Sequence, residues 1–342
     1  MSNRFTDLLD ARCVILADGA TGTNMFAYGL ASGDAPELWN VEHASRVAAL
    51  HQSFVDAGSD LFLTNTFGGT RHRLKLHKSQ HRVVELNEAA ARIARQVADA
   101  APRPVVVAGS MGPTGELFEP LGPLSMQDAV AAFEEQARAL ADGGVDVLWV
   151  ETMSSREEVE AALHAGAVTG LPMVCTLSFD TNGSTMMGIT PADFVALCRE
   201  LGPSPAAYGT NCGVGPAEVV AGILRLRGAA HDDDLLVAKA NCGIPEFVDG
   251  AIRYSGTAEL MADYARLAVD AGARIVGGCC GTTADIVRAM RDAIDKHERG
   301  DAPTLDTVEQ RLGTLSAGAR RGDGSARAER SKSRRSSRRR RA

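Results

Sequence analysis

Short apolar runs alternate with longer amphipathic stretches along most of the chain. Eight of these runs are rich in Val, Ile and Leu and lack the apolar–polar alternation of a half-exposed strand, a pattern typical of parallel strands that are buried on both faces. The runs cover residues 13–17, 60–64, 105–109, 146–150, 173–177, 206–209, 235–240 and 274–277. Helical patterns follow them in turn, at residues 43–57, 81–101, 125–142, 154–168, 191–201, 216–226, 257–271 and 284–296.

Eight strand–helix units in this order predict an α/β fold that consists of a single (β/α)8 barrel. The alternative, an open doubly wound sheet, has about six strands and a Gly-rich fingerprint after the first of them. Three of the predicted helices end on glycine, which tolerates the left-handed conformation at a helix C-terminus. The three tripeptides are Asp56-Ala57-Gly58, Asp142-Gly143-Gly144 and Asp270-Ala271-Gly272.

The composition fits one large folded body. The chain has 342 residues, of which 45% are hydrophobic and 23% are charged, and this apolar content is enough for a sizeable core. The sequence contains no run of about 18 apolar residues, so we expect no membrane-spanning helix. The N-terminal sequence is polar and lacks the apolar segment of a secretory signal, and we therefore expect the protein in the cytoplasm.

The formal net charge of −7 averages two different regions. Residues 313–342 contain 11 Lys and Arg and two acidic residues, whereas residues 1–312 contain 25 basic and 41 acidic residues. We therefore predict a barrel domain at 1–312 and a disordered Arg/Ser-rich tail at 313–342. The tail either contacts nucleic acid, anionic lipid or the acidic barrel, or is only a solubilising extension. Outside the tail we expect no binding of nucleic acid.

Polar, thiol and glycine residues gather where the predicted strands end. A barrel places its functional residues just past the C-terminal ends of several strands. Seven of the eight strand ends fit this rule, at residues 18–23, 65–69, 110–113, 151–152, 210–213, 241–243 and 278–281. The sequence therefore predicts a site at the mouth of the barrel.

The cysteines give the sharpest chemical signal at this mouth. Cys212 follows the sixth strand, while Cys279 and Cys280 follow the eighth, so the three thiols can face one point. Three thiolates with a fourth position open describe a catalytic zinc site, and sulfur ligands favour Zn²⁺ over magnesium or calcium. The alternative is that the three side chains only fill core space, which suits adjacent cysteines between glycines less well.

Four further cysteines complete the set of seven. We expect Cys13, Cys175 and Cys198 to be core residues, because they lie inside predicted strands or a helix. Cys242 is ambiguous, because Asn-Cys-Gly occurs at 211–213 and again at 241–243. The spacing leaves open which copy of this tripeptide binds a metal.

Other polar candidates are less specific. Asp18 and Glu151 are carboxylates at strand ends, and each is either a partner for a substrate ammonium or a solvated loop charge. Trp39, one of two tryptophans, is either a packing anchor under a loop or a wall for a cationic ligand. We interpret three histidines that lie among Arg and Lys as a solvated surface, namely His72, His77 and His81.

Four of the motifs resemble those of the homocysteine S-methyltransferase family. They are Asp18-Gly19-Ala20-Thr21-Gly22-Thr23, Asn65-Thr66-Phe67, Asn211-Cys212 and Gly277-Gly278-Cys279-Cys280-Gly281. The resemblance covers about residues 10–297 and implies a (β/α)8 barrel, in agreement with the strand count. Residues around Trp39 to His43 look most similar to the betaine–homocysteine S-methyltransferase type.

The resemblance implies that Cys212, Cys279 and Cys280 are zinc ligands and carry the catalysis. Homocysteine would bind this zinc as a thiolate and attack an activated methyl group in line, which gives methionine. The family often has Ala at the position of Cys242, so we interpret this cysteine as a neighbour of the site that does not bind the metal.

The resemblance also assigns the substrate contacts. Asp18 and Glu151 match positions that hold the amino group of homocysteine, and Gly19 and Thr66 lie in the motifs that contact the amino acid. Homocysteine and a methylated donor are thus the expected partners of the site.

For the donor, we expect glycine betaine, with S-methylmethionine or another sulfonium compound as the alternative. All of these donors present a methylated cation, which aromatic faces suit, and Trp39, Phe67 and Tyr28 are the candidates. Because no further domain follows the barrel in this sequence, we expect no cobalamin or folate module in the chain.

Two hypotheses of other classes stay open. In the first, the barrel is a homocysteine-binding module that serves a separate methyl-transfer protein. In the second, the thiols have a redox or metal-storage role. The sequence also leaves the oligomeric state open.

Overall fold

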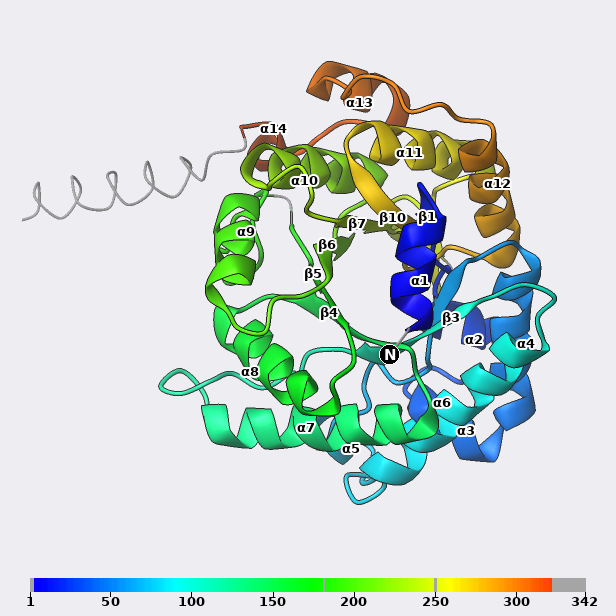
Figure 1. Cartoon of the computed structure of the whole chain (residues 1–342), viewed down its shortest axis with the longest axis vertical. Coiled ribbons are helices and arrows are strands. Elements are labelled where there is room, and N and C mark those ends of the chain that lie inside the picture. The colour runs from blue at the N-terminus through cyan, green and yellow to red at the C-terminus, as the bar shows by residue number, and fades with distance from the viewer. Residues whose placement is uncertain (1–2, 181, 249–250, 322–342) are drawn as a thin grey trace, which may run out of the picture.

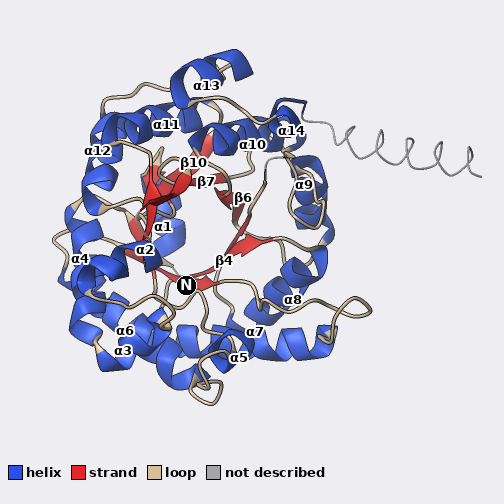
Figure 2. Ribbon diagram, turned by 180° about the vertical axis from the view of Figure 1, so that it is seen from behind, coloured by secondary structure: helices blue, strands red, loops and turns tan. Residues whose placement is uncertain are grey.

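The computed structural model describes residues 3–180, 182–248 and 251–321. Eight parallel strands form one nearly closed barrel in the order β1-β10-β7-β6-β5-β4-β3-β2, which confirms the predicted fold. Figure 2 shows the ring of strands inside a ring of helices. The strands are β1 (Ile15–Leu16), β2 (Leu61–Leu63), β3 (Val106–Met111), β4 (Val147–Met153), β5 (Met173–Leu177), β6 (Ala207–Cys212), β7 (Leu236–Ala240) and β10 (Ala273–Gly278).

The seam between β1 and β2 closes the barrel in an unusual way. Within the described residues no strand ladder joins these two strands. The Asp60 N–H donates to the Leu16 carbonyl at 2.7 Å, and the Asp60 carboxylate accepts the Leu16 N–H at 2.9 Å. At Asp60 the seam therefore depends on one backbone hydrogen bond and one side chain, where each of the other strand pairs has a ladder.

Eight helices form the outer layer and agree with the predicted ones to within a few residues (Figure 1). Glycines in the left-handed conformation follow three of them, with φ 101° at Gly58, 97° at Gly144 and 107° at Gly272, as the tripeptides predict. The helices are α4 (Ala44–Asp56), α6 (Val83–Ala100), α7 (Met126–Gly143), α8 (Arg156–Gly166), α9 (Pro191–Glu200), α10 (Pro216–Ala229), α11 (Ala258–Asp270) and α12 (Ala284–Asp295).

The barrel interior is a separate apolar core from the larger one between strands and helices. Trp149 of β4 and Ile275 of β10 lie in this inner core, and Phe5 of the N-terminal helix α1 (Arg4–Ala11) completes it. The side chain of Asn3 donates to the Asp146 carbonyl, just before β4, at 2.9 Å. Helix α1, which the sequence pattern did not predict, thus plugs the end of the barrel where the strands begin (Figure 1).

Short elements decorate the loops and were also not predicted. Most of them follow β1, β2 and β7, on the side where the strands end. They are α2 (Gly22–Met25), η1 (Phe26–Tyr28), η2 (Pro36–Leu38), α3 (Trp39–Glu42), α5 (Arg71–Lys75), η3 (Ala167–Thr169) and the antiparallel hairpin of β8 (Pro245–Val248) and β9 (Ala251–Tyr254).

The C-terminal segment continues past residue 312, where the predicted barrel domain ends. After α13 (Leu305–Leu312), the chain continues over the barrel as a short helix, α14 (Ala317–Arg321). Leu315 and Ala319 are buried because they pack into the larger core. Residues 313–321 therefore belong to the folded body, and the rest of the predicted tail, 322–342, lies outside the described residues. Within the part that the structure describes, no helix is long and apolar enough to cross a bilayer.

Candidate active site and metal centre

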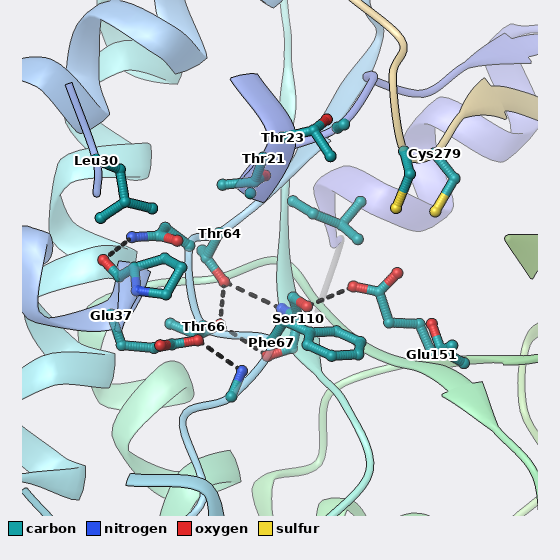
Figure 3. Close-up of a pocket in the computed structure, with 18 of the residues that line it drawn as sticks. Thr21, Thr23, Leu30, Glu37, Thr64, Thr66, Phe67, Ser110, Glu151 and Cys279 are labelled. Carbon is teal, nitrogen blue, oxygen red and sulfur yellow. Dashed lines mark hydrogen bonds between the residues drawn. The ribbon is translucent and has the colours of Figure 1, made fainter. Parts of the chain in front are cut away.

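A cavity of about 490 Å³ opens where the barrel strands end, within the size range of small-molecule sites. Every barrel strand except β5 contributes to its wall, with residues that lie at the C-terminal end of the strand or just after it. In Figure 3, Cys279 and Glu151 lie on one side of the cavity and Glu37 lies on the other. The predicted position of the site, at the mouth of the barrel, is thus also the position of a real cavity.

Three thiols lie together in the cavity wall. The Sγ atoms of Cys212, Cys279 and Cys280 are all within 4.8 Å of one another, and none of the three cysteines forms a disulfide. Cys212 has φ 62°, a left-handed conformation that is rare for residues other than glycine and is frequent at functional sites. The end of β6 is therefore bent at the residue that brings its thiol to the other two.

Two asparagines brace this group of thiols. Asn211 donates from Nδ2 to the Thr152 hydroxyl at 2.7 Å and to Cys279 Sγ at 3.9 Å. Asn241 accepts the Cys280 N–H at 3.0 Å and donates to the Gly213 carbonyl at 2.9 Å. The two copies of Asn-Cys-Gly thus have different roles. Cys212 of the first copy is one of the three clustered thiols, whereas Asn241 of the second copy hydrogen-bonds to the backbone of Cys280.

The side chain of Tyr254 lies beside the third thiol. Its hydroxyl hydrogen-bonds to the thiol of Cys280. A Cβ at Gly281, where φ is 78°, would lie 2.3 Å from the Tyr254 ring. Only glycine at 281 allows both the left-handed turn after Cys280 and this close approach of the ring.

The free thiols hold their protons tightly. A hydrogen bond to Cys279 raises the pKa of Cys212 to about 12, and a hydrogen bond to Cys212 raises the pKa of Cys280 to about 11. A tetrahedral zinc ion with Zn–S bonds of about 2.3 Å places its sulfur ligands about 3.8 Å apart. The spacing and the all-sulfur donor set therefore fit a zinc ion, which would replace the thiol protons.

Of the two predicted carboxylates, Glu151 lies in the cavity wall. Its Oε1 accepts a hydrogen bond from the Ser110 hydroxyl at 2.5 Å. Burial raises its pKa, and the ammonium of Lys239 is the largest opposing influence. Asp18 is also buried, but it is not part of the cavity wall that the described residues form. The structure thus brings only one of the two carboxylates into direct reach of a ligand.

Three further predicted residues, Gly19, Thr66 and Phe67, line the cavity. The Thr66 hydroxyl donates to the Ser110 carbonyl at 2.7 Å, and Phe67 exposes 37% of its surface. A Cβ at Gly19 would lie 2.3 Å from the carbonyl of Thr282, so the backbone there is as close to its neighbour as a glycine allows.

Trp39 does not form the cationic-ligand wall that was one of its two predicted roles. It is 5% exposed and lies outside the cavity wall. Its ring packs edge-on to His43, with 4.7 Å between the ring centroids, and the Arg46 guanidinium lies 5.1 Å from its ring. The short helix α3 turns the ring towards α4, so Trp39 is a packing anchor. Tyr28 is likewise not part of the wall that the described residues form.

The wall also contains residues that were not singled out as ligand contacts from the sequence, among them the ionisable side chains of Glu37, Arg73, His77 and Lys239. Glu37 is buried and its Oε1 accepts the Gly68 N–H at 2.7 Å. His77 is exposed, as expected, but it also faces the cavity. The signal for Lys239 was present, because a lysine inside an otherwise apolar strand needs a buried partner.

The other cysteines follow the predictions except at one position. Cys175 and Cys198 are buried in the core, whereas Cys13 is exposed because β1 begins only at Ile15. Cys242 is 1% exposed and donates its N–H to the Cys280 carbonyl at 2.9 Å. Its thiol does not belong to the group of three.

The chain is similar to known proteins over most of its length. The chain is 29% identical to methionine synthase of Mycobacterium leprae over 316 residues, which are 87% of this chain and 26% of that protein. It is also 29% identical to methionine synthase of Mycobacterium tuberculosis over 312 residues, 86% of this chain and 26% of that protein. The chain thus spans about a quarter of the length of these relatives.

Among solved structures, the metallated form of the homocysteine methyltransferase MmuM from Escherichia coli matches with a TM-score of 0.70 and 25% identity, over 85% of this chain and 99% of that chain. The oxidized form of the same protein matches with a TM-score of 0.71 and 26% identity over the same shares. The family profile described as Homocysteine S-methyltransferase matches residues 15–294. This match includes β1, the thiol group and every strand between them, and the chain therefore belongs to the homocysteine S-methyltransferase family.

Proposed function

We propose that the protein transfers a methyl group from a methylated ammonium or sulfonium donor to the thiol of homocysteine and so forms methionine. The observation that carries this proposal is the combination, in one cavity wall, of three thiols and a buried carboxylate. The thiols suit a metal that accepts a sulfur ligand, and the carboxylate suits the ammonium of an amino acid. An amino acid that carries a thiol can bind the metal through its sulfur and the carboxylate through its ammonium.

For the metal, we propose Zn²⁺ held by Cys212, Cys279 and Cys280. When bound there, zinc would lower the pKa of the substrate thiol and so provide a thiolate nucleophile at neutral pH. The spacing of the three sulfurs supports this assignment, as does the similarity to a metallated homocysteine methyltransferase. A site of free thiols also suits a reducing compartment such as the cytoplasm.

The chain's own residues fix the substrate in place. Glu151 accepts the α-ammonium, and its carboxylate cannot swing away because Ser110 holds Oε1 at 2.5 Å. Thr66 and Gly19 line the same cavity. The substrate is thus held at its amino group while its sulfur points to Cys212, Cys279 and Cys280. Such positioning lowers the entropic cost of the methyl transfer.

For the donor, we propose glycine betaine. Phe67 presents an aromatic face to the cavity, and such faces attract methylated cations. Arg73 and His77 line the same cavity and act electrostatically on Glu37, so they lie at the end away from the thiols. The guanidinium of Arg73 at this end of the cavity suits a donor that carries a carboxylate. Betaine, S-methylmethionine and dimethylsulfoniopropionate all have this group.

The test is an assay of methionine formation with the purified zinc-loaded chain. Homocysteine is supplied with one donor at a time, from a panel of betaine, S-methylmethionine, dimethylsulfoniopropionate, methylcobalamin and methyltetrahydrofolate. We expect turnover with betaine and less with the sulfonium donors. Methionine formation with S-methylmethionine but not with betaine would correct the donor and leave the reaction class intact.

A second candidate function rests on the length of the relatives. The chain matches only 26% of the methionine synthases, as a module of a larger assembly would. In that case the barrel binds homocysteine and a separate protein delivers the methyl group. Tight binding of homocysteine, together with no turnover for any free donor of the panel, would favour this candidate over the first.

A further inference from the structure

The floor of the cavity contains a buried group of three charged residues, which we call the floor triad: Asp18, Glu151 and Lys239. Lys239 Nζ lies 2.5 Å from Asp18 Oδ1, and the two side chains are 2% and 1% exposed. Lys239 and Glu151 line the cavity, whereas Asp18 does not. The lysine therefore stands between Asp18 and any ligand. The role inferred for the triad rests on the proposed function, because it concerns how that site recognises an amino acid.

Both oxygens of Asp18 are already engaged. Oδ1 pairs with Lys239, and Oδ2 accepts the Leu63 N–H at 2.8 Å. These contacts join β1, β2 and β7. A substrate ammonium at Asp18 would have to displace either the lysine or the backbone of β2, and each displacement would leave a buried charged or polar group without its partner.

Glu151 is the opposite case. Its Oε1 accepts the Ser110 hydroxyl, and among the described residues none forms a hydrogen bond or ion pair with its Oε2. The side chain is nearly buried, and it faces the cavity. With both carboxylates ionised and the lysine charged, the floor triad has a net charge of −1, so one added cation neutralises it.

We propose that Lys239 is a positioning residue that separates the tasks of the two carboxylates, since it commits Asp18 to the wall of the barrel and leaves Glu151 as the acceptor for the α-ammonium of the substrate. The floor triad thereby selects a thiol that carries one amino group. This assignment differs from the expectation that Asp18 and Glu151 share the ammonium.

The experiment compares two thiols that differ only in the amino group. Homocysteine and 4-mercaptobutyrate are titrated by calorimetry into the zinc-loaded full chain, without a methyl donor. The readout is the ratio of the two dissociation constants, the amine preference, which a merely structural change does not move. The wild type is expected to prefer homocysteine. Failure of the wild type to bind homocysteine would refute the proposed function itself.

The variants then locate the acceptor. Glu151→Gln is expected to reduce the amine preference at least about 30-fold, as removal of one partner of a buried charge pair does. Asp18→Asn is expected to change it less than about 5-fold, because Asp18 has no contact with the ammonium. An equal loss of preference in Asp18→Asn and Glu151→Gln overturns the inference while homocysteine binding by the wild type upholds the function.

Variants of the lysine complete the test. Lys239→Met leaves Asp18 buried without its cation, so we expect a lower melting temperature. The double variant Asp18→Asn with Lys239→Met removes both charges and is expected to regain melting temperature and to keep the amine preference within about 5-fold of the wild type. The double variant also substitutes for Asp18→Asn if that variant does not fold. Loss of the preference in a folded, zinc-loaded double variant contradicts the proposal.

Discussion

Each end of the barrel contains a buried aspartate, and the two differ in what surrounds them. Where the strands begin, Asp60 accepts a backbone N–H of β1 at 2.9 Å and pairs with Arg291 at 3.0 Å. At the mouth, Asp18 accepts a backbone N–H of β2 at 2.8 Å and pairs with Lys239 at 2.5 Å. The two carboxylates thus fasten the same pair of strands from opposite ends.

The difference lies in the balance of charge. At the closed end, Arg12 joins Arg291 around Asp60, at 3.4 Å, and Asp295 pairs with Arg291 at 2.5 Å, so two arginines balance two carboxylates. At the mouth, Glu151 joins Asp18 beside one lysine, so carboxylates outnumber the cation. The charges at the closed end are thus balanced within the protein, whereas the mouth has one negative charge left for the proposed cationic group of a ligand. We therefore expect substitutions at the closed end to affect stability and those at the mouth to affect binding and turnover.

The largest effect on activity is expected from substitution of one of the three clustered cysteines. Cys279→Ala removes one of three sulfurs that fit the metal, and we expect loss of both bound zinc and methyl transfer. Metal analysis of the purified protein and the methionine assay measure the two losses. Cys13→Ala is the matched control, because Cys13 is exposed and not part of the group. Full zinc content in the Cys279→Ala variant would falsify the metal assignment.

The next effect is expected at the closed end. Asp60→Asn removes the buried partner of Arg291, which keeps only its exposed contact with Asp295. Breaking such a buried pair costs about 3 to 5 kcal/mol of unfolding free energy. Urea denaturation measures this loss. Glu134→Gln, which removes an exposed ion pair with Arg138, is the control and is expected to cost less than about 1 kcal/mol. A stable Asp60→Asn variant with impaired homocysteine binding would reverse the comparison between the two ends.

A buried histidine without a partner gives a pH-dependent effect. His51 of α4 is fully buried, its ring nitrogens have no hydrogen-bond partner among the described residues, and burial lowers its pKa to about 4. Since its pKa in the unfolded chain is about 6.5, the unfolded state takes up this proton first as the pH falls. The contribution to stability is therefore complete above pH 6.5 and falls by about 3 kcal/mol as the pH drops to 4.

The check is the pH dependence of the unfolding free energy in the wild type and in His51→Leu. We expect the unfolding free energy of the wild type to fall by about 3 kcal/mol relative to that of His51→Leu as the pH falls from 6.5 to 4, because only the wild type loses this contribution. Parallel curves over that range would show that His51 does not titrate in this way.

The smallest effect is expected at the donor end of the mouth. Phe67→Leu removes the aromatic face that lines the cavity, and we expect the KM for the donor to rise about 3- to 30-fold, the range of a cation–π contact. The dissociation constant of homocysteine stays the same. Trp39→Phe is the control, because Trp39 lies outside the cavity. A larger rise in Trp39→Phe than in Phe67→Leu would return the cation site to Trp39.

The barrel could be predicted from the sequence because each of its strands is buried on both faces and each is followed by a periodic helix. The same logic located the site, since the residues past the strand ends include the three thiols. The prediction was wrong at the start of β1, because a strand of two residues is too short for the sequence pattern to mark where it begins. Cys13 was placed in a strand that begins at Ile15, and it is exposed for that reason.

Pairings between distant residues could not be predicted. Asp18 and Lys239 are 221 residues apart, so no local sequence pattern indicates that they pair. The family resemblance had assigned the carboxylate of Asp18 to the substrate instead. Composition also misplaced the end of the fold, because Leu315 and Ala319 are too few to mark a packed segment in a basic, Ser-rich stretch. Trp39 is ambiguous for the same reason, since only the turn of α3 decides which way its ring points.

The seam between β1 and β2 has a mechanical consequence. The loops after these two strands supply much of the cavity wall, from Gly19 to Glu37 and from Leu63 to His77. One backbone hydrogen bond and two aspartate side chains, rather than a ladder, hold the strands together there. We therefore expect the loops on the two sides of the seam to shift relative to each other while the seven ladders of the barrel stay intact. The seam that is weakest as a sheet thus lies beside the cavity, where we expect such a shift to widen or narrow the mouth without unfolding of the barrel.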